Sequence, residues 1–199
     1  MEDKKLTEEE SLALITSMIN TAKNVYYESG TGALLWGFTN LICFSLAYLD
    51  ATVKGFDLPF NPFLLMIFTF FIQLYYGRIE RKYRKARTYA EDVNVYVWSA
   101  FGICILILTL AGGYAGIGYT TLPVLLLFFG MPTFISGCIS KFKPFIVGGI
   151  TCWILSIIAF LYKGYHAHLL VAAGATAAWI IPGIILRIKY MKAVHVQRA

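Results

Sequence analysis

Six apolar runs, separated by short polar connections, are the dominant feature of this sequence. Each run is near the roughly 20 residues that an α-helix needs to cross the hydrocarbon core of a membrane. The runs lie at about 33–49, 58–76, 94–113, 120–139, 144–162 and 168–186. Only 14% of the residues are charged, against about 25% in a soluble domain. We therefore expect an all-α, membrane-embedded bundle of six transmembrane helices, formed by the single domain 31–199.

Basic residues near the ends of the predicted spans fall almost entirely on one side. With a cytoplasmic N-terminus, only Lys54 and Lys163 of the 17 Lys and Arg residues lie on the outer side. Cytoplasmic loops normally hold the excess of Lys and Arg. The pattern predicts a multi-pass protein of the cell inner (cytoplasmic) membrane, with both termini in the cytoplasm. A missed span would place basic loops on both sides of the membrane, so the one-sided charge also supports six spans.

Residues 1–30 are predicted to form a cytoplasmic segment of their own. Thr7 and Glu10 have the spacing of a capping box, and apolar residues recur at helical spacing until Gly30. The pattern indicates an amphipathic helix over residues 7–28, before the membrane. Its acidic start differs from the basic start of a secretory signal, so we expect no cleavage.

The stretch from Arg78 to Asp92 contains no Gly or Pro, so the second helix is expected to continue into the cytoplasm. Its basic side chains should attract anionic lipid headgroups, at about 1 kcal/mol for each residue near the surface. The residues predicted to do so are Arg78, Arg81, Lys82, Arg84, Lys85 and Arg87. No nucleic-acid-binding module accompanies this charge, so we expect no nucleic-acid partner.

Two local patterns mark the outer ends of spans. Asn61 followed by Pro62 resembles an N-cap with proline at the first helical position, which would start the second helix just inside the outer surface. The run GGYAGIGY, from Gly112 to Tyr119, is predicted to be a glycine-rich external loop.

The cores of the six spans contain no ionisable residue. Such residues usually mark proton relays, ion paths or catalytic centres in membranes. Their absence argues against proton-coupled transport, ion pumping and membrane-embedded hydrolysis. We predict a non-enzymatic protein that needs no cofactor.

Four uncharged residues are candidates for a substrate site if the protein is a transporter. Asn40 and Gln73 can hydrogen-bond across helices. Pro132 and Pro182 each free a carbonyl group one turn earlier, and broken helices line binding sites in transporters. Bonds between helices and ordinary kinks are the commoner roles.

His166 and His168 form a His-x-His pair in a predicted external loop. Two imidazoles at this spacing could bind a metal if a third ligand came from elsewhere. The sequence specifies no such ligand, so we predict no metal site. The cysteines lie inside apolar runs without paired spacing and are expected to be buried small hydrophobes. They are Cys43, Cys104, Cys138 and Cys152.

Two further patterns concern helix packing. Trp153 and Trp179 lie nearer mid-membrane than the Trp and Tyr residues at the ends of the spans, so each indole N–H should find an acceptor on a neighbouring helix. Small residues crowd the fifth and sixth spans, around Gly148, Gly149 and 172–178. They allow backbones to approach closely. We favour packing within the bundle, with a homo-oligomer as the alternative.

The run GMPTFISGCISKFKPFIVGGITCWILSIIAF (Gly130 to Phe160) and the later run WIIPGIILRIKY (Trp179 to Tyr190) resemble an uncharacterised family of small bacterial inner-membrane proteins of about 200 residues. The run SLALITSMINTAKN, ahead of LLWG at the first span, fits the same resemblance. It covers nearly the whole chain and implies a bacterial inner membrane. It adds no catalytic residue.

These observations favour a non-enzymatic interaction or regulatory membrane protein. Its polar features lie in the predicted cytoplasmic segments 7–28 and 78–92, which would contact a protein partner. The alternative is a small solute or lipid transporter that uses the neutral polar residues and kinked helices of the bundle.

Overall fold

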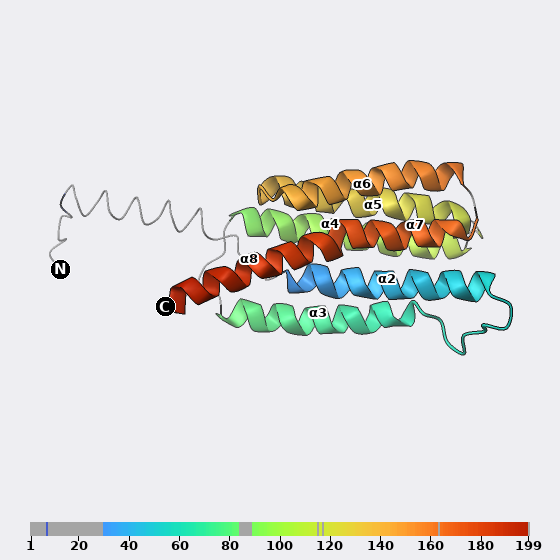
Figure 1. The fold of residues 1–199 in the computed structure, drawn as a ribbon, viewed down its shortest axis with the longest axis horizontal. Coiled ribbons are helices and arrows are strands. Elements are labelled where there is room, and N and C mark those ends of the chain that lie inside the picture. The colour runs from blue at the N-terminus through green and yellow to red at the C-terminus, as the bar shows by residue number, and fades with distance from the viewer. Residues whose placement is uncertain are drawn as a thin grey trace.

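The structure is a computed structural model that describes residues 7, 30–83, 89–114, 116, 118–162 and 164–198. All regular elements in these ranges are helices (Figure 1), which confirms the all-α prediction for this part of the chain. They are α2 (Thr31–Thr52), α3 (Leu64–Tyr83), α4 (Tyr89–Tyr114), α5 (Gly118–Ile139), α6 (Lys143–Leu161), α7 (His166–Ala175), the π-helical segment η1 (Thr176–Ile180) and α8 (Ile181–Arg198). The amphipathic helix predicted over residues 7–28 lies outside the described residues, apart from Thr7.

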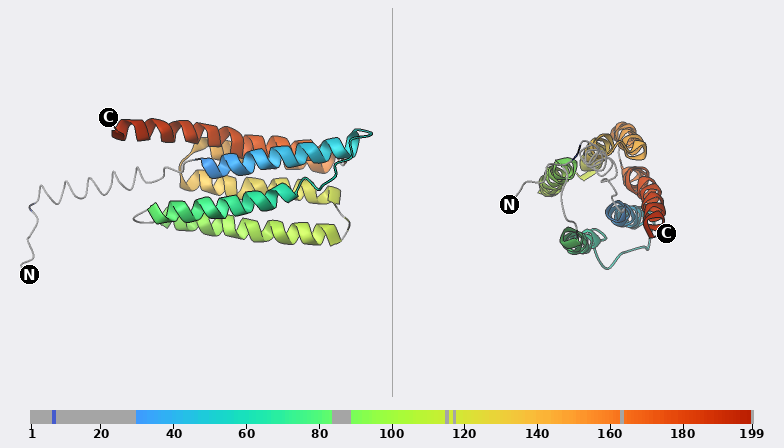
Figure 2. Two further views of the ribbon diagram at one scale, coloured as in Figure 1. Left: turned by 90° about the horizontal axis from the view of Figure 1, so that it is seen from below. Right: turned by 90° about the vertical axis from the view of Figure 1, so that its left-hand side faces the viewer.

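Five helices are long and apolar enough to cross a membrane, as expected for a multi-pass membrane protein. They are Thr31–Thr52, Asp92–Tyr114, Thr120–Ile139, Lys143–Leu161 and His166–Lys192, the last combining α7, η1 and most of α8. The apolar part of α3, Leu64–Ile79, is shorter. The helices run side by side, with successive helices in opposite directions (Figures 1 and 2). One end of the bundle, which we call the basic end, therefore carries Arg78, Lys141, Lys143, Arg187 and Lys189.

The second helix starts at Leu64 rather than at residue 58, which corrects the predicted start. Pro59 and Pro62 cannot donate helical hydrogen bonds, and the Leu58 N–H instead bonds to Asp50 Oδ1 at 3.0 Å. The Cys43 thiol donates to the Pro62 carbonyl oxygen at 3.2 Å. Residues 58–63 therefore run back along the outer part of α2 before α3 begins.

Asn61 Oδ1 accepts the N–H of Phe63 at 3.0 Å, as expected of a cap, but α3 begins only at Leu64, so Pro62 precedes the helix instead of being its first residue. The glycine-rich external loop is shorter than predicted. Gly112 and Gly113 belong to α4, which ends at Tyr114, and α5 begins at Gly118. Gly112 lies close to Thr121 of α5, so the packing of these two helices favours helical backbone here.

The hydrophobic core lies between α2, α5, α6 and the last helix. Leu126, Val171 and Ala175 are completely buried, and Trp179 is nearly so. By contrast, among the elements that the structure describes, α3 packs only against α2, and α4 packs mainly against α5, with ring contacts from Trp98 and Phe101 to Trp179. The end-on view shows both helices at the edge of the bundle (Figure 2).

Small residues of the fifth and sixth spans are used for packing inside the bundle. A Cβ atom added to Gly149 would lie 2.8 Å from the Gly130 carbonyl oxygen. One added to Gly148 would lie 2.7 Å from the Ala177 carbonyl oxygen. Because the backbones touch at these points, no larger side chain fits between the helices.

The cysteines follow the prediction only in part. Cys43 and Cys152 are buried, whereas Cys104 is half-buried and Cys138 is exposed. All four are free thiols. Cys138 lies in the last turn of α5, on a face that the neighbouring helices do not cover.

The last helix changes its hydrogen-bond pattern just before Pro182. The Ile181 N–H bonds to the Thr176 carbonyl oxygen, five residues back rather than four. Pro182 has no N–H to donate and its ring crowds the preceding turn, so the wider π-helical turn accommodates it. Pro182 therefore changes the helix locally without ending it, and Pro123 and Pro132 lie within the continuous helix α5.

Candidate functional site

A chain of buried polar side chains joins α4 to α5 near the basic end. The Trp98 indole N–H donates to Ser136 Oγ at 3.0 Å, and Ser136 Oγ donates to Asn94 Oδ1 at 2.5 Å. Asn94 and Ser136 are 8% and 3% exposed. Because burial makes an unpaired polar group costly, these bonds fix which faces of the two helices meet.

A second pair connects α5 to the π-helical segment. The Trp179 indole N–H donates to Thr133 Oγ1 at 2.9 Å, and Thr133 Oγ1 donates to the Phe129 carbonyl oxygen at 2.8 Å. The Trp179 ring lies 4.5 Å from the Phe129 ring and 6.1 Å from the Trp98 ring, between centroids. The aromatic rings thus unite both polar pairs into one cluster, which we call the Trp179 cluster.

The Trp179 cluster lies where two proline-containing helices meet. Pro132 directly precedes Thr133, and Pro182 follows η1 after a single residue. Both candidate prolines therefore lie close in sequence to residues of this cluster, although neither proline is a member of it. Its polar members are neutral and hydrogen-bonded to one another or to backbone, so the cluster can hold these helices in register.

The structure does not bring the two candidate amides together. Asn40 is buried, and its Nδ2 donates to the Trp36 carbonyl oxygen of its own helix at 2.8 Å. Gln73 lies against Gly32, where a Cβ atom would be 3.2 Å from its Nε2. Gly32 is about two helical turns, or roughly 12 Å, from Asn40 along α2. The two amides therefore lie at different depths.

The His-x-His pair lies in the first turn of α7, which corrects the predicted loop. Residues two apart do not share a helix face. The His166 ring lies 6.0 Å from the Tyr48 ring, and His168 Nδ1 is 3.1 Å from the Tyr165 carbonyl oxygen. Among the described residues, no group of three or more His, Cys, Asp or Glu side chains could hold a metal ion.

The predicted headgroup-binding residues are described only in part. Arg78 is exposed at the end of α3. Arg81 and Lys82 belong to α3, which continues to Tyr83, but their side chains lie outside the described part. The predicted extension of the second helix toward Asp92 is only partly correct, because residues 89–92 belong to α4. The residues Arg84, Lys85 and Arg87 lie outside the described residues altogether. Of the segments 7–28 and 78–92, which were predicted to contact a protein partner, the structure describes only Thr7, 78–83 and 89–92.

Two cavities are described, and both lie at the surface of the bundle. One, of about 450 Å³, is lined by Ala47, Asp50 and residues 58–63. The other, of about 420 Å³, lies between α6 and the last helix. Neither is lined by any of the four candidate substrate-site residues. Buried side-chain nitrogen and oxygen atoms in the described residues all have hydrogen-bond partners.

The sequence predicted acceptors for Trp153 and Trp179 but not the hydrogen-bonded chain of Trp98, Ser136 and Asn94. Both predicted acceptors exist, since Trp153 donates to the Leu127 carbonyl oxygen at 3.2 Å and Trp179 donates to Thr133. Asn94 and Ser136 were not singled out. One signal was present, because Asn94 and Trp98 are four residues apart and share a helix face.

Comparison of the chain with protein-family models, with curated proteins and with solved structures finds no match.

Proposed function

We propose that the chain crosses a bacterial inner membrane six times, with the basic end and both termini in the cytoplasm. The apolar part of α3 is short, but residues 58–63 run beside α2 and cover the remaining depth on the outer side. Fifteen of the 17 Lys and Arg residues then lie on the cytoplasmic side, which agrees with the usual bias.

We further propose that the protein is a non-enzymatic interaction or regulatory protein. Its partner would bind α3 and α4, two consecutive helices that do not pack on each other in their described parts and that we call the α3–α4 hairpin. The observation that carries this proposal is the weak packing of the hairpin. In α4, 6% of the most apolar stretch is buried, against 56% in His166–Lys192. A pair of helices that contributes so little to the core is available for contacts with another protein.

Charge indicates what kind of partner the hairpin would accept. The connection between α3 and α4 is strongly basic, with six Lys or Arg residues between Arg78 and Arg87. An acidic cytoplasmic surface on the partner would complement it. We therefore propose a membrane protein that lays an apolar helix against α3 and α4 and an acidic segment against residues 78–87.

The transporter alternative has less support. Neither described cavity reaches Asn40 or Gln73, and the Trp179 ring packs against Phe129 and donates to Thr133, the residue next to Pro132. A cysteine placed at Asn40 provides a direct test. Labelling by a charged, water-soluble thiol reagent in native membranes would favour the transporter, because it requires a water path to mid-depth.

Site-specific photocrosslinking in intact cells tests the interaction. A photoreactive residue replaces Phe71 of α3 or Leu106 of α4, and Ile157 of α6 is the control. Their side chains are 63%, 60% and 63% exposed, so all three positions are equally available to a neighbour. We expect Phe71 and Leu106 to give a protein adduct of one constant mass and Ile157 to give none.

A charge variant links the adduct to the basic connection. Replacing Arg81, Lys82, Arg84 and Lys85 by Gln should remove the adduct at Phe71 and leave the protein in the membrane. An adduct of equal yield at Ile157, or one that persists in the charge variant, would contradict the proposed partner.

A further inference from the structure

The cavity between α6 and the last helix is an apolar groove open to the membrane. Gly148 and Ala177 form its floor, and Val147, Thr151 and Ile181 line its sides. It has a volume of about 420 Å³, within the range of small-molecule sites of about 300–1,000 Å³. It follows about two turns of α6, or roughly 12 Å. This length is short for a partner helix but suits part of an acyl chain.

The groove exists because the helices touch through their backbones at its floor. A Cβ atom on Gly148 would lie 2.7 Å from the Ala177 carbonyl oxygen. Val147 and Ile181 rise on either side and are 62% and 52% exposed. The Thr151 hydroxyl donates to the Val147 carbonyl oxygen of its own helix at 2.9 Å. The groove therefore presents a surface that a hydrocarbon chain can contact without leaving a polar group unpaired.

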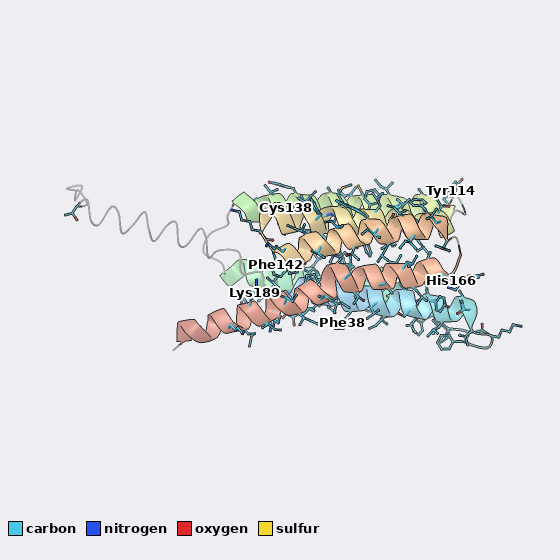
Figure 3. All side chains as sticks on the ribbon, turned by 45° about the horizontal axis from the view of Figure 1, so that its top comes forward. Phe38, Tyr114, Cys138, Phe142, His166 and Lys189 are labelled. Atoms are coloured by element: carbon cyan, nitrogen blue, oxygen red, sulfur yellow. The ribbon has the colours of Figure 1, made fainter. Side chains whose placement is uncertain are left out.

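Lysine side chains lie around the end of the groove that is nearest the basic end of the bundle. Lys143 is the first residue of α6 and lines the groove. Lys141 is exposed in the preceding turn, and Lys189 Nζ lies 5.1 Å from the centre of the Phe142 ring (Figure 3). Phe142 gives no side-chain cap to α6, so the positive end of the helix dipole adds to the same field.

We propose that this groove binds an anionic phospholipid, with one acyl chain along Gly148 and Ala177 and the phosphate beside Lys143. An apolar groove next to three lysines matches a molecule that is apolar at one end and negative at the other. The site is separate from the basic connection between α3 and α4, because α3 packs only on α2 among the described elements. It adds a lipid-binding role to the proposed interaction.

Native mass spectrometry of the whole protein in detergent tests the proposal. The protein is titrated with phosphatidylglycerol and, separately, with phosphatidylcholine of the same acyl chains. We expect one phosphatidylglycerol to bind at least tenfold more tightly than phosphatidylcholine, since each nearby lysine contributes about 1 kcal/mol and about 1.4 kcal/mol is tenfold. Soluble glycerol phosphate should not displace it, because it has no acyl chain.

Two pairs of variants separate the headgroup from the chain. K143Q should weaken phosphatidylglycerol binding about fivefold, whereas K192Q, a lysine at the same end that does not line the groove, should not. T151F fills the groove and should abolish selective binding. T109F is its control, because Thr109 lies on the exposed side of α4 and its hydroxyl likewise bonds to its own helix.

A second groove variant, A177L, and circular dichroism of every variant distinguish loss of the groove from misfolding. Equal affinity for the two lipids would overturn the proposal. The proposal would also fail if K143Q bound phosphatidylglycerol as tightly as K192Q does, or if T151F and A177L bound it as selectively as T109F does. Displacement of the lipid by glycerol phosphate at equal concentration would contradict it as well.

Discussion

Replacing Gly149 by Ala tests the close packing of α5 and α6. A Cβ atom at this position would lie 2.8 Å from the Gly130 carbonyl oxygen, 2.8 Å from Phe134 Cβ and 2.9 Å from the Phe134 backbone nitrogen. Two of these three atoms are backbone and cannot rotate away. The helices must therefore separate to accept a single methyl group.

The expected loss follows from two opposing effects. Ala is favoured over Gly inside a helix by about 1 kcal/mol, while overpacking a tight site costs about 1–3 kcal/mol. Because backbone atoms meet the added methyl group, the upper part of that range applies, and G149A should lose about 1–2 kcal/mol. Gly102 is the matched control, since nothing lies within 4 Å of its added Cβ. G102A should gain up to about 1 kcal/mol.

Thermal unfolding in detergent, followed by circular dichroism, measures both variants. For a chain of this size about 1 kcal/mol corresponds to about 2–4 °C in Tm. G149A should therefore unfold about 2–8 °C below the parent protein, and G102A at or slightly above it. A G149A variant at least as stable as G102A would refute the backbone contact between α5 and α6.

Two other predictions address the interior. T133V leaves the Trp179 indole N–H without its acceptor, so the free energy of unfolding should fall by about 1–3 kcal/mol. The variant should unfold at a lower temperature than T109V, in which the replaced hydroxyl faces outward. Equal Tm values would contradict the Trp179 cluster. In detergent, a maleimide should alkylate exposed Cys138 quickly and leave buried Cys152 unmodified until the protein unfolds. Comparable rates, read by peptide mass spectrometry, would contradict the packing of α6 against α7.

The sequence was most informative where a helix is defined by apolar length and flanking charge. The fourth and fifth predicted spans nearly coincide with α5 and α6, because Lys141 and Lys143 interrupt the apolar sequence between them. The second predicted span wrongly includes residues 58–63. Leu58 and Phe60 are apolar, so hydropathy extends the span over them. Hydropathy does not report that Pro59 and Pro62 lack the N–H groups that a helix needs.

The Trp179 cluster could not be predicted from the sequence in the same way. Ser136 and Asn94 are 42 residues apart, and their contact depends on which faces of α4 and α5 meet. Periodicity identifies the face of one helix but not its partner across the bundle. The π-helical turn is no easier to predict, because it precedes Pro182 whereas Pro123 and Pro132 lie within an α-helix.

The central claim is that the chain crosses the membrane six times with its basic end in the cytoplasm. The span with the shortest apolar helix is α3, so the most direct test places cysteines before and after the α3–α4 hairpin, in a C104A, C138S background. A membrane-impermeant maleimide is applied to intact cells and to inverted vesicles. A51C, at the end of α2, and Y114C, at the end of α4, should be labelled only from outside, and K192C only from inside. If A51C and Y114C were labelled from opposite sides, α3 would not cross the membrane and the six-span account would be wrong.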